Sequence, residues 1–176
     1  MPQKSKPTIA LTGATGFLGS HLMASLLSKG YNIVVFGRPA KNEPLKDRIT
    51  RLLQWFGVEN RSEQVSCVDA DLSLEHLGIE HGEYLRLCSE VGSVIHCASD
   101  TSFSESKREK VMAANINNLK GILGFSKKAD VSFFHYISTA YVAGSGTVYC
   151  KEILSSAKIF TNVYEESKAA AENIIS

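Results

Sequence analysis

The chain has 176 residues, a length that suits one domain with its own hydrophobic core. Lys and Arg number 19 against 18 Asp and Glu, so no charge imbalance points to nucleic acid or an anionic membrane as a partner. No apolar run is long enough to cross a bilayer, and the N-terminal MPQKSKPT lacks the apolar stretch of a secretory signal. We therefore expect no transmembrane segment and a cytoplasmic protein.

Apolar runs and helical stripes alternate along the chain. The expected strands are residues 8–13, 32–37, 64–72, 92–99 and a run that begins at 131. The expected helices cover residues 17–28, 45–56, 80–90, 107–127 and 161–175. Strands separated by helices of this length favour βαβ units. The predicted fold is α/β, a doubly wound Rossmann-type parallel sheet with helices on both faces.

The cysteines and histidines suggest no metal chemistry. Cys67, Cys88, Cys97 and Cys150 are widely spaced and form no CxxC pair. The histidines also lack the spacing of metal ligands. We expect reduced thiols and no metal site.

The first expected strand leads directly into TGATGFLG, a glycine-rich motif with its glycines spaced three and three. Glycines here permit a tight turn and a close approach of the backbone to a pyrophosphate, and the following helix points free N–H groups at the same anion. Because the motif lies between a strand and a helix, it predicts a dinucleotide site. The alternative is a structural glycine turn without a ligand. The predicted contacts come from the motif itself: Gly13, Thr15, Gly16, Phe17, Leu18 and Gly19.

The end of the second expected strand, VVFGRP, indicates which dinucleotide is preferred. Gly37 and Arg38 stand where sites that prefer NAD commonly place an acidic residue for the ribose hydroxyls. A guanidinium binds a 2′-phosphate in bidentate fashion, and Arg48 lies nearby in the sequence. We predict that NADP(H) is favoured over NAD(H), with Arg38 and Arg48 at the phosphate. The alternative is that Arg38 is a solvated surface charge.

Four further motifs follow in order: DADLS, HCAS, ISTAYVAG and YEESK. Together with TGATGFLG, their order and spacing resemble the extended short-chain dehydrogenase/reductase family over nearly the whole chain. The resemblance implies that Tyr164 donates a proton, while Lys168 lowers its pKa and holds the nicotinamide ribose. The hydroxyl that orients the substrate carbonyl falls on Thr139, with Ser138 as the competitor. Asn115 matches the family's helix asparagine, which supports the lysine through water.

The same resemblance implies further contacts with the cofactor. Asp71 and Leu72 match the pair that contacts the adenine. Cys97, Ala98 and Ser99 occupy the turn that lies along the cofactor.

Within that family, the chain is similar to the thioester reductase and fatty acyl-CoA reductase group, the male-sterility type. The similarity lies in the arginine-rich stretch RPAKNEPLKDRITRLLQWFG and in the motifs VIHCASDTSF, HYISTAYVAG and VYEESKAAAE. This implies NADPH-dependent reduction of an acyl thioester, on CoA or on the phosphopantetheine arm of a carrier protein, to an aldehyde or an alcohol. Thr139 and Tyr164 would stabilise the developing oxyanion. One alternative is an NAD(P)-dependent epimerase, dehydratase or reductase that acts on an NDP-sugar or another carbonyl or hydroxyl substrate. The other is a non-catalytic NADP(H)-binding sensor or scaffold.

The position of YEESK near the last residue leads to an expectation about domain content. Members of this family continue after the tyrosine helix with another strand and a substrate-binding region. We therefore expect residues 1–176 to form a single NADP(H)-binding Rossmann domain, truncated before the substrate-binding region. An open sheet edge favours pairing with another copy, so we also expect a homodimer. Because the substrate pocket would lack one wall, we expect weak turnover by this chain alone.

Overall fold

The computed structural model describes residues 7–40, 43–145, 153–154 and 159–176, in which strands and helices alternate. The strands are β1 (Thr8–Thr12), β2 (Ile33–Gly37), β3 (Val65–Asp69), β4 (Val91–His96) and β5 (Phe133–Tyr136). The α-helices are α1 (Phe17–Ser28), α2 (Leu45–Trp55), α3 (His81–Glu90), α4 (Arg108–Lys128) and α5 (Val163–Ile175). Short 3-10 helices are η1 (Glu59–Gln64), η2 (Glu75–Gly78), η3 (Glu105–Lys107) and η4 (Ala140–Ala143).

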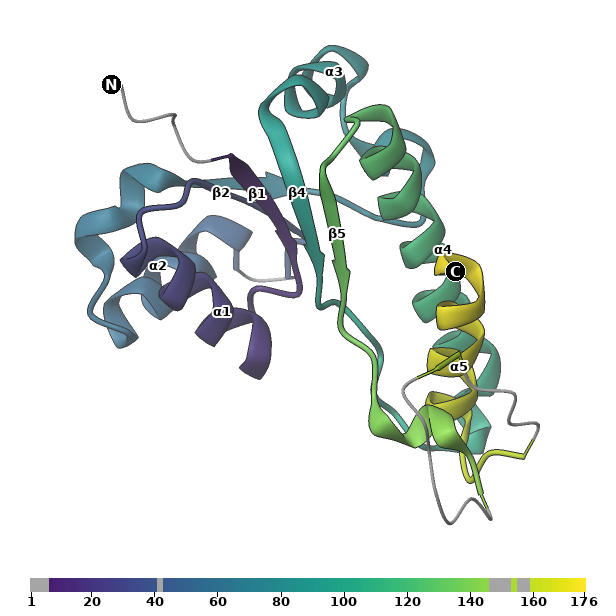
Figure 1. Cartoon of the computed structure of the whole chain (residues 1–176). Helices are drawn as coiled ribbons and strands as arrows, with labels where there is room; N and C mark the ends of the chain where they lie inside the picture. Colours follow the sequence, from purple (N-terminus) through teal and green to yellow (C-terminus); the bar gives the residue numbers. More distant parts are fainter. Residues whose placement is uncertain (1–6, 41–42, 146–152, 155–158) are drawn as a thin grey trace.

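The strands form one parallel sheet in the order β3-β2-β1-β4-β5. Figure 1 shows α1 and α2 on one face of the sheet, α3 and α4 on the other, and α5 beside α4. The predicted doubly wound fold with helices on both faces is confirmed. The strand order reverses between β1 and β4, and ligands of such sheets bind in the crevice outside the carboxyl ends of the strands at this switch point.

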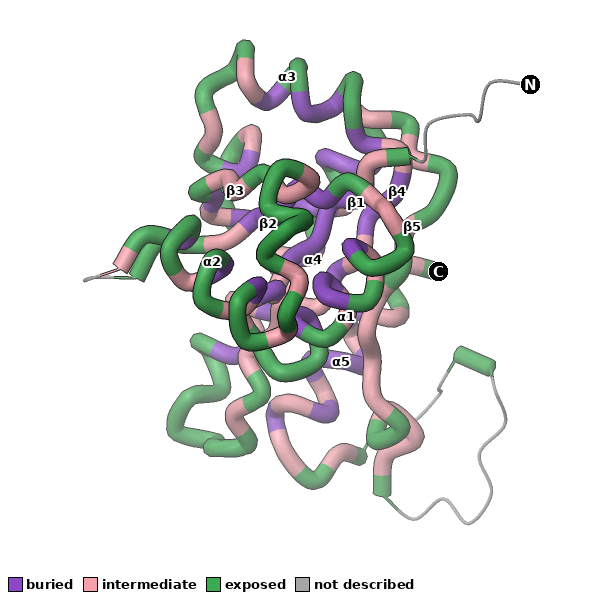
Figure 2. The backbone as a smooth tube through the Cα atoms, turned by 90° about the vertical axis from the view of Figure 1, so that its left-hand side faces the viewer, coloured by how far each residue is buried: buried purple, intermediate pink, exposed green. Residues whose placement is uncertain are grey.

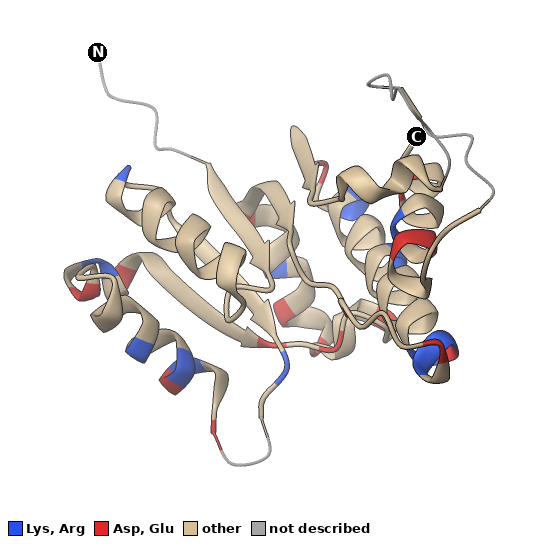
Figure 3. Cartoon of the chain, turned by 90° about the horizontal axis from the view of Figure 1, so that it is seen from below, with Lys and Arg blue, Asp and Glu red and all other residues tan. Residues whose placement is uncertain are grey.

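The two faces of the sheet bury two separate hydrophobic clusters. In β2, Ile33 and Val35 pack toward α1 and α2, whereas Val34 and Phe36 pack toward α3 and α4. The Phe36 ring meets Phe125 of α4 edge-on, with 5.2 Å between ring centroids. Figure 2 shows the buried residues along the strands and on the inner sides of the helices, and Figure 3 shows most charged residues on helices and at strand ends. This packing holds the carboxyl ends of the strands in place.

The segment η2 has a backbone that the sequence did not predict. His76 and Leu77 adopt φ angles of 49° and 59°, in the left-handed region that favours glycine. Such a backbone costs roughly 1–2 kcal/mol per non-glycine residue. The Leu77 side chain is fully buried in the cluster below α4, and that burial contributes about 1.5–3 kcal/mol. The buried leucine therefore offsets much of the local strain.

The expectations about membrane spans and about thiols can be compared with the described residues. No helix in the described part of the chain is both long and apolar enough to cross a membrane. Cys67, Cys88 and Cys97 are free thiols, while Cys150 lies outside the described residues.

At Gly121, α4 packs closely against the segment that follows β3. A Cβ atom there would lie 1.8 Å from the carbonyl oxygen of Leu72, just after β3. A Cβ on Gly124, on the same helix, would meet nothing within 4 Å. We expect Gly121→Ala to lower the free energy of unfolding by about 2 kcal/mol or more, because backbone must move to relieve the clash. Gly124→Ala should leave it unchanged or raise it by up to about 1 kcal/mol.

Urea denaturation of the two variants measures the difference directly. Equal unfolding free energies for the two would contradict the close approach of α4 to β3.

Candidate active site

A cavity of about 730 Å³ opens at the carboxyl ends of the strands, at the switch point of the sheet. This volume lies within the range of roughly 300–1,000 Å³ that is common for ligand pockets. Most of the residues predicted to bind the cofactor line it. These are Gly13, Thr15, Gly16, Arg38, Arg48, Leu72, Cys97, Ala98 and Ser99.

The glycine loop fits an anionic ligand. Gly13 has φ 73°, and a Cβ there would lie 2.7 Å from the backbone nitrogen of Ala98. A Cβ on Gly19 would lie 2.1 Å from the carbonyl oxygen of Gly13. Helix α1 then starts with Gly16 as its N-cap, without a side-chain cap and without an acidic residue in its first turn. Its first N–H groups and the positive end of the helix dipole therefore remain available to a phosphate.

Other predicted cofactor residues lie outside the lining of the cavity. The Phe17 side chain is 84% exposed and Leu18 is 45% exposed, so only their backbone N–H groups can serve the anion site. Gly19 is buried against Gly13. The Asp71 carboxylate accepts hydrogen bonds from the Ser73 N–H and hydroxyl, which lower its pKa, with a smaller effect of the Arg38 charge. Lys168 also lies outside the lining.

One wall of the cavity was not predicted. Lys110, Ala114 and Asn118 of α4 line it, together with Asp100 and Thr101 after β4. The three α4 residues are spaced four apart and therefore share one helical face. That spacing is the signal in the sequence that could have identified them.

Arg48 connects the glycine loop to the end of β2. Its Nη2 donates to the Thr15 hydroxyl at 2.8 Å, and its Nη1 donates to the carbonyl oxygen of Arg38 at 3.0 Å. The guanidinium is half-buried, whereas the Arg38 side chain is exposed at the cavity. Both cations therefore lie at the end of the cavity formed by β2 and α2.

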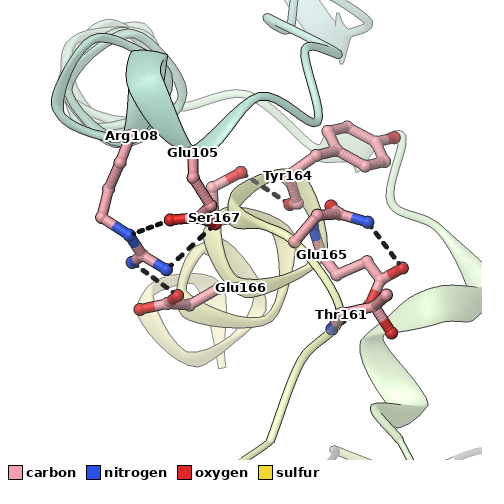
Figure 4. Close-up of polar contacts among 8 residues, drawn as sticks. Glu105, Arg108, Thr161, Tyr164, Glu165, Glu166 and Ser167 are labelled. Carbon is pink, nitrogen blue, oxygen red and sulfur yellow. Dashed lines mark hydrogen bonds and ion pairs between the residues drawn. The ribbon is translucent and has the colours of Figure 1, made fainter.

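The first turn of α5 is stabilised by capping. The Asn162 side chain accepts a hydrogen bond from the Glu165 N–H, and the Glu165 carboxylate accepts from the Thr161 N–H at 2.9 Å and from the Asn162 amide. Figure 4 shows this cap beside Arg108 of α4, which bonds Glu105 and reaches Glu166 at 2.7 Å. These contacts fix the turn of α5 that carries Tyr164.

The two candidate hydroxyls differ in their partners. The Thr139 hydroxyl lies close enough to Tyr164 to act on it, in the direction that lowers the pKa of the phenol. Burial outweighs this effect and raises the pKa of Tyr164, contrary to the expected lowering by Lys168. The Ser138 hydroxyl instead donates to the carboxylate of Glu172. Of the two hydroxyls, Thr139 therefore acts on the phenol, whereas Ser138 is engaged by Glu172.

Lys168 is almost fully buried, one turn after Tyr164. Its Nζ donates to the carbonyl oxygen of Ile137 at 2.7 Å and lies 4.6 Å from the centroid of the Tyr136 ring and 5.9 Å from that of Tyr164. Burial lowers the pKa of Lys168 to about 8, opposed by Cys97 and Glu172. Lys168 is therefore directed at the exit of β5, which explains why it does not lower the pKa of Tyr164.

A buried hydrogen-bond centre joins β1 to β4. The Thr12 hydroxyl accepts from the N–H groups of Cys97 at 3.2 Å and Ala98 at 3.1 Å, and its oxygen lies 2.8 Å from Nδ1 of His96. Since both lone pairs of the hydroxyl are used, it donates to Nδ1, and the proton of the neutral imidazole is on Nε2. Burial, with a smaller effect of the Lys168 charge, lowers the pKa of His96 to about 4.

Asn115 links the cavity to α5. Its side-chain oxygen accepts from the Ser99 hydroxyl and the Asp100 N–H, and its nitrogen donates to the carbonyl oxygen of Asp100 and, at 2.8 Å, to the Ser167 hydroxyl. Ser167 stands directly before Lys168. The predicted asparagine therefore supports the helix segment that carries the lysine, through its neighbour.

Doubly wound sheets with a glycine loop at the switch point bind dinucleotides, and this chain is a dinucleotide-binding α/β protein. Sequence comparison identifies the family. Residues 11–176 match the NAD-binding family described as "Male sterility protein". The chain belongs to this family, and the group named from the sequence motifs is confirmed.

The relatives include reductases and large synthetases. Equisetin synthetase of Fusarium heterosporum is 33% identical over 66% of this chain and 3% of that protein, and fatty acyl-CoA reductase 2 of Mus musculus is 29% identical over 78% and 28%. The terminal R domain of the myxalamid PKS-NRPS pathway superposes with a TM-score of 0.85 at 27% identity, over 97% of this chain and 45% of that chain. A UDP-glucose 4-epimerase from Stenotrophomonas maltophila, 22% identical, shares the fold with a TM-score of 0.73. The chain thus spans about half of these solved structures.

The buried, neutral His96 makes stability depend on pH. Its pKa is about 4 in the folded state and about 6.5 in the unfolded chain. The unfolded chain therefore binds more protons between these values. The contribution of His96 to the free energy of unfolding is complete above about pH 6.5 and decreases by about 3 kcal/mol as the pH falls toward 4. We expect His96→Gln, which keeps an acceptor for Thr12, to remove this part of the pH dependence.

Denaturation near pH 7 and near pH 4.5 tests this. His135→Gln, on the exposed side of β5, is the matched control and should retain the pH dependence of the parent. An unchanged slope in His96→Gln would contradict the buried neutral imidazole.

Proposed function

We propose that the protein reduces an acyl thioester with NADPH, to an aldehyde or an alcohol. The observation that carries this proposal is the placement of Thr139, Tyr164 and Lys168 on the exit of β5 and on α5, with Lys168 close to Cys97 of the dinucleotide cavity. The likeness to fatty acyl-CoA reductase 2 and to an R domain supports a thioester on CoA or on a phosphopantetheine carrier protein.

The residues of this chain have separate roles in that reaction. A bound nicotinamide supplies the hydride for the thioester carbonyl carbon. The raised pKa of Tyr164 keeps its phenol protonated at neutral pH, so it can donate a proton to the carbonyl oxygen, with Thr139 as a second donor. Loss of the thiol from the resulting hemithioacetal then gives the aldehyde. Lys168, with its pKa of about 8, adds a buried positive charge beside the developing oxyanion.

We propose that NADP(H) is preferred because Arg38 and Arg48 lie at one end of the cavity. Arg38→Ala should weaken NADPH binding about 10- to 100-fold, since a charge-assisted bond to the 2′-phosphate is lost, and leave NADH binding unchanged. Arg51→Ala is the control, because Arg51 of α2 pairs with Glu43 at 2.6 Å. Calorimetric titration with both cofactors measures the effect. NADH binding as tightly as NADPH would refute the preference.

Substitution of Tyr164, the proposed proton donor, distinguishes an enzyme from a non-catalytic NADP(H)-binding sensor. Tyr164→Phe should reduce thioester turnover about 10²- to 10⁴-fold and leave the dissociation constant of NADPH unchanged. Tyr141→Phe, which alters an exposed phenol close to Thr139, should retain activity. An acyl-CoA assay that follows NADPH absorbance provides the rates. A protein that binds NADPH but reduces no thioester favours a sensor, whereas conversion of an NDP-sugar favours the epimerase alternative.

We further propose that residues 1–176 act as one cofactor-binding domain in the cytoplasm, and that copies pair through β5. This strand is at the edge of the described sheet, and Phe133 on it is 64% exposed. Light scattering across concentrations would detect the homodimer.

A further inference from the structure

Glu172 contacts the candidate active site, although the sequence motif that ends on it, VYEESKAAAE, gave it no role. It lies on α5, one turn after Lys168, and its side chain is half-buried. Its carboxylate accepts a hydrogen bond from the Ser138 hydroxyl. Ser138 directly precedes Thr139, the residue whose side chain meets the Tyr164 phenol.

The exit of β5 is thus tied to α5 at two successive residues. Lys168 Nζ donates to the carbonyl oxygen of Ile137 at 2.7 Å, and Ser138 donates to Glu172. The two anchors on α5 are four residues apart and therefore lie on one face of the helix. Tyr164 is four residues further toward the N-terminus on the same face. Two hydrogen bonds from this face, one to the Ile137 carbonyl and one from the Ser138 hydroxyl, hold consecutive residues and leave Thr139 little freedom relative to the phenol.

The conformation of Thr139 itself follows from this attachment. It is extended, with φ −147° and ψ 148°, and acts as the N-cap of η4, where its hydroxyl accepts from the Tyr141 N–H at 3.4 Å. This bond is long, so the cap alone holds the hydroxyl weakly. The tether through Ser138 is the stronger constraint on where Thr139 lies.

The charges around Glu172 favour the same arrangement. Lys168 and Glu172 attract each other across one helical turn, and the carboxylate acts to raise the lysine pKa. Tyr136 of β5 faces the same pair, and burial together with the charges of Tyr164 and Glu172 raises its pKa. His96 and Cys97 of β4 are the other titratable groups close to Lys168.

We infer that Glu172 is a positioning residue for the reaction, because through Ser138 it holds Thr139 against Tyr164. The inference rests on the proposed function for its kinetic consequence, but the geometry can be tested without turnover. It also assigns the serine of ISTAYVAG a structural partner, while the threonine beside it serves the substrate.

The experiment compares Glu172→Ala and Ser138→Ala with the conservative Glu172→Gln and Ser138→Thr in the full protein. The alanine variants should lower kcat about tenfold by misplacing Thr139, with KM for the acyl-CoA and the dissociation constant of NADPH unchanged. The conservative variants keep the acceptor oxygen or the hydroxyl and should restore kcat to within about threefold of the parent. The double alanine variant should be no slower than either single variant, since both remove one shared bond. Glu90→Ala, which removes an exposed carboxylate paired with Arg86 on α3, is the control that should not change kcat.

Amide hydrogen exchange of residues 137–143 provides a readout that needs no substrate. Exchange should accelerate in Glu172→Ala and Ser138→Ala but not in the conservative variants or in Glu90→Ala. Unchanged exchange in the alanine variants would overturn the inference, and so would faster exchange with an unchanged kcat in an active enzyme. Absence of thioester turnover in the unmodified protein would instead count against the proposed function, and the exchange data would still decide whether Glu172 holds Thr139.

Discussion

The hydroxyl of Thr12 is the contact on which the site depends. It is fully buried at the end of β1, and it accepts the first two N–H groups after β4 while it donates to His96. The carboxyl ends of two neighbouring strands are thereby joined at the point where strand order reverses. The glycine loop starts at the next residue and packs directly against Ala98. No alanine at Gly13 would permit this approach, so the loop and the turn after β4 form one wall of the cavity.

The same contact supports the residues around Lys168. His96 stacks on Tyr136 of β5, with 5.9 Å between ring centroids, and the Tyr136 ring lies below the Lys168 ammonium. A charged imidazole here would repel the lysine, so the Thr12 bond that favours the neutral tautomer also preserves the buried cation. Asn115 joins the two parts a second time by bonding Asp100 and Ser167. The glycine loop and the first turns of α5 are therefore parts of one hydrogen-bonded unit.

Sequence patterns predicted the fold well because local signals and tertiary packing agree in this chain. Helix α1 begins and ends where its apolar stripe does, and each strand is an apolar run beside a turn. The left-handed backbone at His76 and Leu77 could not be predicted, since only burial of the leucine compensates for it. The site was predicted through motifs whose residues have known roles, so residues without such a role were missed. Glu172 ends a motif and the α4 residues share one helical face, but only the packing of the helices shows that these side chains reach the site.

The electrostatics of the site suit the reduction of a carbonyl. Tyr164 holds its proton firmly because it is partly buried, and Lys168 retains its charge at neutral pH against a desolvation penalty. A cation in such surroundings is stabilised by any negative charge that develops nearby. In the proposed reaction, an oxyanion that forms beside Tyr164 would therefore be stabilised by the Lys168 charge. Glu172 partly offsets the effect of burial on Lys168, and its carboxylate accepts a hydrogen bond from Ser138. The fixed charge would then stabilise the transition state more than the neutral substrate.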